Sequence, residues 1–185
     1  MGRIKLFTRE DVLEKAIPVF WRRGFSDTGV ADLEKATGVN KSGLYGEFKS
    51  KDALFVACLE HYFECREWRA LLSAEPLGWS NIEQFLRSAF ATPEGQSGCF
   101  AINSLRDLSL LPTEATAVFA KNSVILKKLI GNNITGENTV LAPEAITDLI
   151  LTFFYGLGIE QNIKNPRRAF DHKVSDFLAL LVPAK

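Results

Sequence analysis

Two cysteines and a histidine at helical spacing are the residues of this sequence best suited to chemistry. Cys58, His61 and Cys65 stand three and four residues apart, the separations at which side chains meet on one face of a helix. Such a set can bind a soft metal ion, react with an oxidant or line a pocket. The two cysteines are about 10.5 Å apart along a helix, so one metal ion cannot easily take both. A metal would need a further ligand, such as Cys99 or His172.

We interpret this face as the wall of a pocket for a largely apolar organic molecule. The same spacing continues to Trp68, and a later predicted helix adds Asn103 and Arg106 among apolar positions. Cys99 follows a glycine at the start of that later helix, where a helix N-terminus favours a thiolate. Sensing of electrophiles or metals stays open as the alternative. The predicted lining residues are Cys58, His61, Cys65, Trp68, Cys99, Asn103 and Arg106.

Enzyme signatures are missing from the sequence. It contains no glycine-rich phosphate loop, no H-E-x-x-H motif and no supported Ser-His-Asp order, and it has only two histidines. We therefore expect no catalytic residue, no cofactor and no metal. A helical thiol enzyme built around Cys99 or Cys65 is the alternative from another class.

The composition fits a globular intracellular protein. The chain has 185 residues, of which 46% are hydrophobic, and its net charge is zero. Three cysteines without C-x-x-C spacing, and no apolar leader at the start, predict a reduced, cytoplasmic environment. Apolar runs fall far short of the roughly 20 residues that a membrane helix needs.

Apolar residues recur at intervals of three and four, which predicts an all-α fold. Thr8, Thr28, Asn40 and Ser50 are the expected helix caps. The helices are predicted over residues 8–23, 29–36, 41–48, 51–73, 81–91, 99–109, 113–130 and 143–163, with a last helix ending at Val182.

The two short helices at 29–36 and 41–48 outline a helix-turn-helix, because a sharp glycine-containing turn joins them. The distribution of charge along the chain agrees with a helix-turn-helix in its first part. The first 51 residues hold ten Lys and Arg against seven Asp and Glu, whereas the remainder holds twelve against fifteen. A basic head on an acidic body suits a protein whose head contacts phosphate.

The stretch Gly-Val-Asn-Lys-Ser-Gly-Leu-Tyr-Gly-Glu-Phe-Lys-Ser-Lys-Asp-Ala-Leu, at residues 38–54, resembles the DNA-binding head of TetR-type transcriptional regulators. The resemblance is strong over residues 8–55. It implies a helix-turn-helix domain at 1–52 and a ligand-binding and dimerisation domain at 53–185. It further implies a homodimeric repressor that a small-molecule effector releases from a palindromic operator. Residues 98–103 look like one branch of the family, in which some members respond to metals or reactive organics.

Roles for single residues follow from the resemblance alone. The segment 41–48 would be the recognition helix in the major groove, with Lys41 and Ser42 on base edges or phosphates. Tyr45 and Lys51 would each contact a phosphate, and Thr28 would cap its helix and touch the DNA backbone. An N-terminal arm would reach the minor groove. The implied DNA-binding residues are Arg3, Lys5, Thr28, Lys41, Ser42, Tyr45 and Lys51.

The recognition helix departs from the family in two ways. Glu47 stands where many members carry an aromatic residue or a histidine that faces phosphate. DNA would repel a carboxylate there, so we expect Glu47 to turn aside or to pair with a nearby lysine. Gly43 and Gly46 leave few side chains on the helix, so readout should lean partly on groove shape.

The last two predicted helices carry wide apolar stripes, which favour a dimer interface. Pairing across a two-fold axis would form a four-helix bundle, and Gly156 and Gly158 would permit close backbone approach. The alternative is that both stripes face inward. The predicted interface residues are Leu149, Phe153, Gly156, Leu157, Val174, Phe177 and Leu181.

Overall fold

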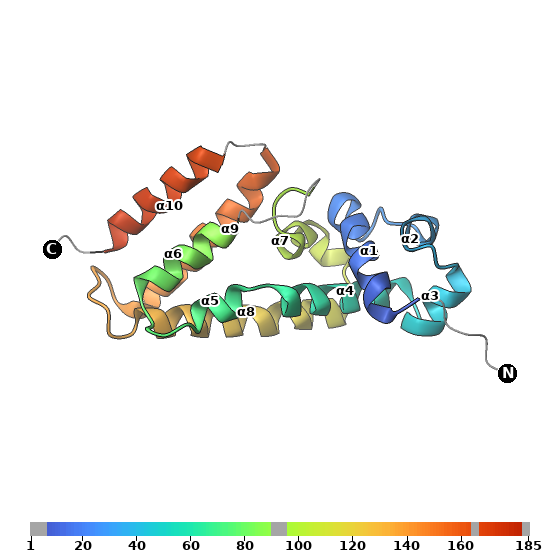
Figure 1. The fold of residues 1–185 in the computed structure, drawn as a ribbon, viewed down its shortest axis with the longest axis horizontal. Coiled ribbons are helices and arrows are strands. Elements are labelled where there is room, and N and C mark those ends of the chain that lie inside the picture. Colours follow the sequence, from blue (N-terminus) through green and yellow to red (C-terminus); the bar gives the residue numbers. More distant parts are fainter. Residues whose placement is uncertain (1–6, 90–95, 164–166, 183–185) are drawn as a thin grey trace. The chain divides into compact units, whose positions relative to one another are not determined.

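The computed structural model describes residues 7–89, 96–163 and 167–182, which are helical and contain no β-strand (Figure 1). The predicted all-α fold class is confirmed. None of the described helices is long and apolar enough to cross a membrane. The α-helices are α1 (Arg9–Arg23), α2 (Val30–Thr37), α3 (Lys41–Phe48), α4 (Lys51–Cys65), α5 (Trp68–Leu72), α6 (Trp79–Ser88), α7 (Phe100–Ser104), α8 (Thr113–Ile134), α9 (Pro143–Glu160) and α10 (Arg167–Leu181). Short 3-10 helices follow α7 and α9, at Leu105–Leu110 (η1) and Gln161–Ile163 (η2).

The chain forms two compact units. The first unit comprises Met1–Cys65 together with Asn103–Ala120, and the second comprises Arg66–Ile102 together with Lys121–Lys185. The whole of α4 and the η1 segment therefore pack with the first three helices. The predicted end of the DNA-binding domain at residue 52 stays a prediction.

Aromatic packing between α1 and α4 forms the core of the first unit. Thr8 begins α1 with the predicted capping box, because its hydroxyl accepts from the Asp11 amide at 3.0 Å and the Asp11 carboxylate accepts in return. Phe20 of α1 then meets Phe55 of α4 edge-on, with the ring centroids 5.1 Å apart. Phe25, just after α1, packs on the same ring at 5.0 Å. These contacts fix α1 across α4.

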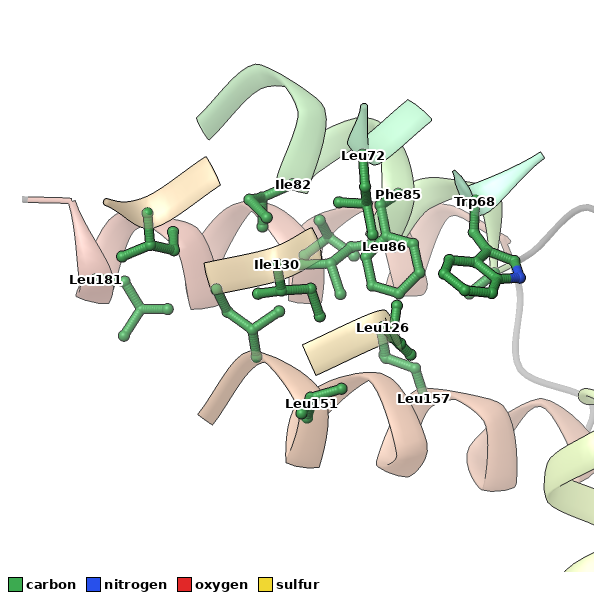
Figure 2. Packing of buried hydrophobic residues seen from close by; sticks show 14 of the residues in the cluster. Trp68, Leu72, Ile82, Phe85, Leu86, Leu126, Ile130, Leu151, Leu157 and Leu181 are labelled. Carbon is green, nitrogen blue, oxygen red and sulfur yellow. The ribbon is translucent and has the colours of Figure 1, made fainter. Parts of the chain in front are cut away.

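The core of the second unit is apolar and draws on every α-helix from α5 to α10 except α7 (Figure 2). Phe85 and Leu86 of α6 meet Ile130 of α8, and all three side chains are fully buried. Leu151 from α9 and Leu181 from α10 belong to the same cluster. Burial of this continuous cluster supplies the main driving force for this unit.

One buried amide connects the helices of this unit. Asn133 of α8 is 1% exposed, and its Oδ1 accepts from the Gly78 amide at 3.0 Å and from the Asn81 side chain at 2.9 Å. Its Nδ2 donates to the carbonyls of Leu72 and Leu129. All four hydrogen-bonding positions of the amide are therefore used.

The largest error of the sequence prediction concerns the helix at 51–73. It is two helices, because α4 ends at Cys65 and α5 begins at Trp68. Trp68 and Leu72 turn into the core of the second unit. The predicted single face that ran from Cys58 through Cys65 to Trp68 therefore does not exist. The 3-4 spacing continues unchanged across the break, so periodicity could not reveal it.

Candidate nucleic-acid interface

The first helix of the helix-turn-helix begins one residue later than predicted. Gly29 is the N-cap of α2, and its amide donates to the Asp32 carboxylate at 3.0 Å. The expectation that Thr28 caps this helix is wrong. Thr28 is 1% exposed, and its hydroxyl donates to the Gly24 carbonyl at 2.6 Å. Thr28 thus braces the loop before α2.

The turn between α2 and α3 is built on a buried hydroxyl and a glycine. Gly38 takes a left-handed conformation, with φ of 72°, which lets the chain reverse at the end of α2. The Thr37 hydroxyl donates to the Leu33 carbonyl at 2.7 Å and accepts from the Val39 amide at 3.2 Å. The direction in which α3 leaves the turn is therefore set by local bonds.

The N-terminus of α3 is capped as predicted. Asn40 accepts a hydrogen bond from the Gly43 amide at 2.9 Å. The backbone amide of Lys41 donates to the Glu34 carboxylate at 2.5 Å, which ties the start of α3 back to α2. Only the Lys41 backbone is used in this bond, so its side chain is not held by it.

Helix α3 has a buried face and an outward face. Leu44 and Phe48 are buried and anchor it to the first unit. Lys41 and Ser42 are exposed, and Tyr45 is half-buried. The Lys41 ammonium lies 5.8 Å from the centroid of the Tyr45 ring, so the two side chains share one face. This face offers a cation and two hydroxyls, the groups that contact phosphates and base edges.

The negative charge of Glu47 is neutralised beside this face. Its carboxylate lies 3.4 Å from the guanidinium of Arg9 on α1. Arg9 in turn lies over the Phe48 ring, 4.4 Å from its centroid. The side chain turns aside as expected, but its partner is an arginine of α1 rather than a lysine.

Lys51 has an internal role in the structure. Its ammonium donates to the carbonyls of Phe25 and Thr28, at 3.0 and 3.1 Å, and lies over the Phe25 ring at 4.4 Å. These contacts fasten the loop before α2 to the start of α4, which Ser50 caps through the Ala53 amide as predicted. A phosphate contact by Lys51 stays a prediction.

The structure thus brings Lys41, Ser42 and Tyr45 together on one accessible face, whereas Thr28 and Lys51 are engaged in the loop before α2. Arg3 and Lys5 lie outside the described residues.

The predicted pocket residues on α4 differ sharply in environment. Cys58 is fully buried in the first unit, and burial raises the pKa of its thiol well above the ordinary range. Cys65 is exposed, with Sγ 3.6 Å from Nε2 of the half-buried His61. Desolvation, followed by the nearby carboxylates of Glu10, Glu64 and Glu14, raises the pKa of the Cys65 thiol. Cys58 and Cys65 therefore do not line one surface.

The remaining predicted pocket residues are divided between the two units. Trp68 packs in the core of the second unit. Cys99 also belongs to the second unit and is half-buried. Asn103 is half-buried and Arg106 is exposed in the first unit, with the Arg106 guanidinium close to Gly24. The sequence analysis missed two further groups, Glu10 and Glu14, which lie beside His61.

The predicted dimer residues are only partly outward. Leu157, Val174 and Leu181 are buried in the core of their own unit, so the expectation that these stripes face a partner is corrected for them. Phe153 and Phe177 are half-buried and stack on each other, with centroids 3.9 Å apart.

The two glycines of α9 also differ. Gly158 is buried and receives the side chain of Ile102 from the same unit. Close approach at Gly158 therefore serves packing within the chain. Leu149 and Gly156 remain exposed.

Residues 12–58 match the model of the bacterial regulatory proteins of the tetR family. The HTH-type transcriptional repressor ComR of Escherichia coli is 35% identical over 114 residues, which cover 58% of this chain and 54% of the relative. The chain thus matches about half the length of ComR. The HTH-type transcriptional repressor DhaR of a Mycobacterium species is 26% identical over 188 residues, covering 95% of this chain and 93% of DhaR.

Solved structures of regulators share the fold. A cysteine mutant of the TetR family transcriptional regulator CifR, complexed with 26-base-pair double-strand operator DNA, superimposes with a TM-score of 0.84 at 22% identity. That match covers 97% of this chain and 100% of CifR. The reduced form of Escherichia coli NemR gives a TM-score of 0.80 at 19% identity, covering 96% and 98% of the two chains.

Proposed function

Because this chain belongs to the TetR family of bacterial regulatory proteins, we propose that it is a transcriptional repressor that binds operator DNA through α3. The named relatives are regulators and not enzymes. The observation that carries the proposal is the two-faced packing of α3. Leu44 and Phe48 hold it from behind, and Lys41, Ser42 and Tyr45 stand on the open side.

In this proposal α3 enters the major groove with its N-terminal end leading. Lys41 and Ser42 lie in the first turn, where they reach base edges or the flanking phosphates. Tyr45, one turn later, donates its hydroxyl to a phosphate. Lys51 and Thr28 hold the loop that positions α2 and α3, which accounts for their internal hydrogen bonds.

We propose that the active species is a homodimer on a palindromic site. Exposed apolar residues on α9 and α10 support this, chiefly Leu149, Ile159 and Leu180. A two-fold pair would present two α3 helices to successive major-groove faces, about 34 Å apart. A repressor must meet chromosomal DNA, so we place the protein in the cytoplasm.

We further propose that a small organic effector bound within residues 53–185 releases the operator. An effector acts only through unequal affinity for the DNA-binding and released states. The exposed thiol of Cys65 supports oxidation or alkylation as the alternative trigger, since the buried thiol of Cys58 offers no such access. Titrating operator release with aromatic organics, in wild type and in Cys65→Ser and Cys99→Ser variants, distinguishes the two triggers.

Selection of bound duplexes from a random library tests the DNA-binding proposal. We expect recovery of an inverted repeat that binds more tightly than a scrambled duplex of the same composition. Recovery of no common sequence, or equal affinity for the scrambled duplex, would overturn the proposal.

A further inference from the structure

A cluster of four potential metal ligands lies where α1 crosses α4 within the first unit. Glu10 and Glu14 are one turn apart on α1, and His61 and Cys65 are one turn apart on α4. The ligand atoms of Glu10, Glu14 and His61 all lie within 4.8 Å of one another. The Sγ atom of Cys65 lies 3.6 Å from Nε2 of His61.

The side chains of the cluster can reach one tetrahedral ion after rotation. The Cys65 Sγ atom lies 3.6 Å from Nε2 and 3.9 Å from Nδ1 of His61, so it now lies against the imidazole ring. Rotation of the exposed Cys65 side chain would place its sulfur beside a metal ion bound to a ring nitrogen. The two carboxylates are exposed and His61 is half-buried, so small side-chain rotations would bring all three onto one ion.

The charge of the cluster also calls for a cation. Glu10 and Glu14 are like charges at i,i+4, an arrangement that destabilises a helix unless it is compensated. Within the described part of the chain, neither carboxylate forms an ion pair with lysine or arginine. Arg9, the neighbouring arginine, is paired with Glu47.

Helix electrostatics explain only part of this arrangement. An acidic residue in the first turn of a helix is stabilised by the helix dipole, which accounts for Glu10. Glu14 lies beyond that turn, and the dipole does not explain why both carboxylates converge on an imidazole and a thiol of another helix.

We propose that Glu10, Glu14, His61 and Cys65 form a binding site for a divalent transition-metal ion of the zinc class. Carboxylate oxygen, imidazole nitrogen and thiolate sulfur are each ligand atoms that bind zinc in proteins. The ion would link the first turns of α1 to the last turn of α4. The proposal does not depend on DNA binding, because the four ligands lie on α1 and α4 and none belongs to the outward face of α3.

Metal titration of the full-length, reduced, metal-free protein tests the site. We expect one Zn²⁺ per chain, measured by competition with a chromophoric chelator. His61→Ala and Glu14→Gln should each weaken binding by tenfold or more. With Co²⁺ as the probe, the wild type should show a thiolate-to-cobalt charge-transfer band, and Cys65→Ser should abolish it.

Three control variants separate this site from general attraction of cations. Glu64→Gln removes the same charge from the residue next to Cys65, His172→Ala removes the other histidine, and Cys58→Ser changes the buried thiol. None should change the zinc affinity by more than about twofold. Each variant is first compared with wild type by thermal unfolding without metal, and Glu14→Gln tests the site if His61→Ala fails to fold.

The proposal is overturned if no zinc binds, if binding survives both His61→Ala and Glu14→Gln, or if Glu64→Gln weakens it as much as Glu14→Gln does. Zinc binding without the cobalt charge-transfer band would refute the role of Cys65. Because no DNA is present in these titrations, failure of the metal site leaves the test of repressor function intact.

Discussion

The carboxylate of Asp107 accepts a hydrogen bond at 3.3 Å from the backbone amide of Ser26, 81 residues earlier in the chain. The η1 segment thus holds one side of the loop before α2, while Lys51 holds the carbonyls of Phe25 and Thr28. A residue from the middle of the chain therefore helps to fix the start of the helix-turn-helix.

Removing this contact should weaken both stability and DNA binding. Asp107→Ala deletes the acceptor for Ser26, and we expect a loss of about 1 kcal/mol in the free energy of unfolding. Operator affinity should fall several-fold as the loop loosens. Thermal unfolding and fluorescence anisotropy measure the two effects, and Asp176→Ala, at an exposed position of α10, is the control. Equal behaviour of the two variants would contradict the role of Asp107.

Gly24 is required for the same junction. It has φ of 85° and ψ of 172°, a backbone conformation that is essentially restricted to glycine, whereas the neighbouring atoms of Arg106 and Asp107 are ends of flexible side chains that can move away. Gly24→Ala should therefore destabilise the protein by about 2 kcal/mol or more. Gly46→Ala is the control, because Gly46 lies inside helix α3 and has nothing within 4 Å of an added Cβ. Gly24→Ala should lower the denaturant midpoint and Gly46→Ala should not, and equal midpoints for the two variants would contradict the requirement for glycine at residue 24.

Asn133 should be the most sensitive polar residue of the second unit. Asn133→Ala would remove the partner of the Gly78 amide and of the Leu72 carbonyl, at an expected cost of about 2–3 kcal/mol. Asn132→Ala changes an exposed amide next to it and should be nearly neutral. Chemical denaturation of the pair measures the difference, which should vanish if the buried network contributes nothing.

The cysteines of α4 should differ in reactivity. Burial raises the pKa of Cys58, so native protein should be alkylated there only on unfolding. Cys65 is exposed, but its pKa is also raised, chiefly by desolvation and the Glu10 carboxylate. A raised pKa means less thiolate at a given pH, so labelling of Cys65 should be slow at pH 7 and should accelerate as the pH rises. Mass spectrometry of timed labelling checks this, and Cys58 labelling at the rate of Cys65 would contradict it.

The surface proposed for dimerisation can be tested without disturbing the core. Leu180 on α10 is 75% exposed, so Leu180→Glu should yield monomers that bind operator weakly. Val124→Glu introduces the same charge at a position on α8 that is 69% exposed, and should remain dimeric. Sedimentation velocity measures both, and a dimeric Leu180→Glu protein would exclude this surface.

Local signals predicted the helix-turn-helix well. The bounds of α3 and the caps Asn40 and Ser50 match the prediction, because capping depends on residues three positions apart. Contacts between segments that are far apart in the chain could not be predicted from the sequence. Nothing near Glu10 indicates that His61 lies beside it, and nothing near Ser26 indicates Asp107.

Amphipathic patterns also left the covering partner undetermined. The apolar stripe of α10 predicted an interface, but Val174 and Leu181 are buried in the core of their own unit. An apolar stripe indicates which face of a helix is buried, but it does not indicate which surface covers that face. For the same reason the unbroken 3-4 spacing concealed the end of α4 at Cys65.

The salt dependence of operator affinity in a Lys41→Ala variant tests the central claim most directly. Lys128 on α8 is exposed and lies outside the first unit, so Lys128→Ala is the control with the same change of charge. If the outward face of α3 binds the operator, Lys41→Ala should weaken binding at least tenfold and lower the slope of log affinity against log salt by about one. Lys128→Ala should change neither quantity. Equal affinities and slopes for the two variants would contradict the assignment of α3 as the DNA-reading helix.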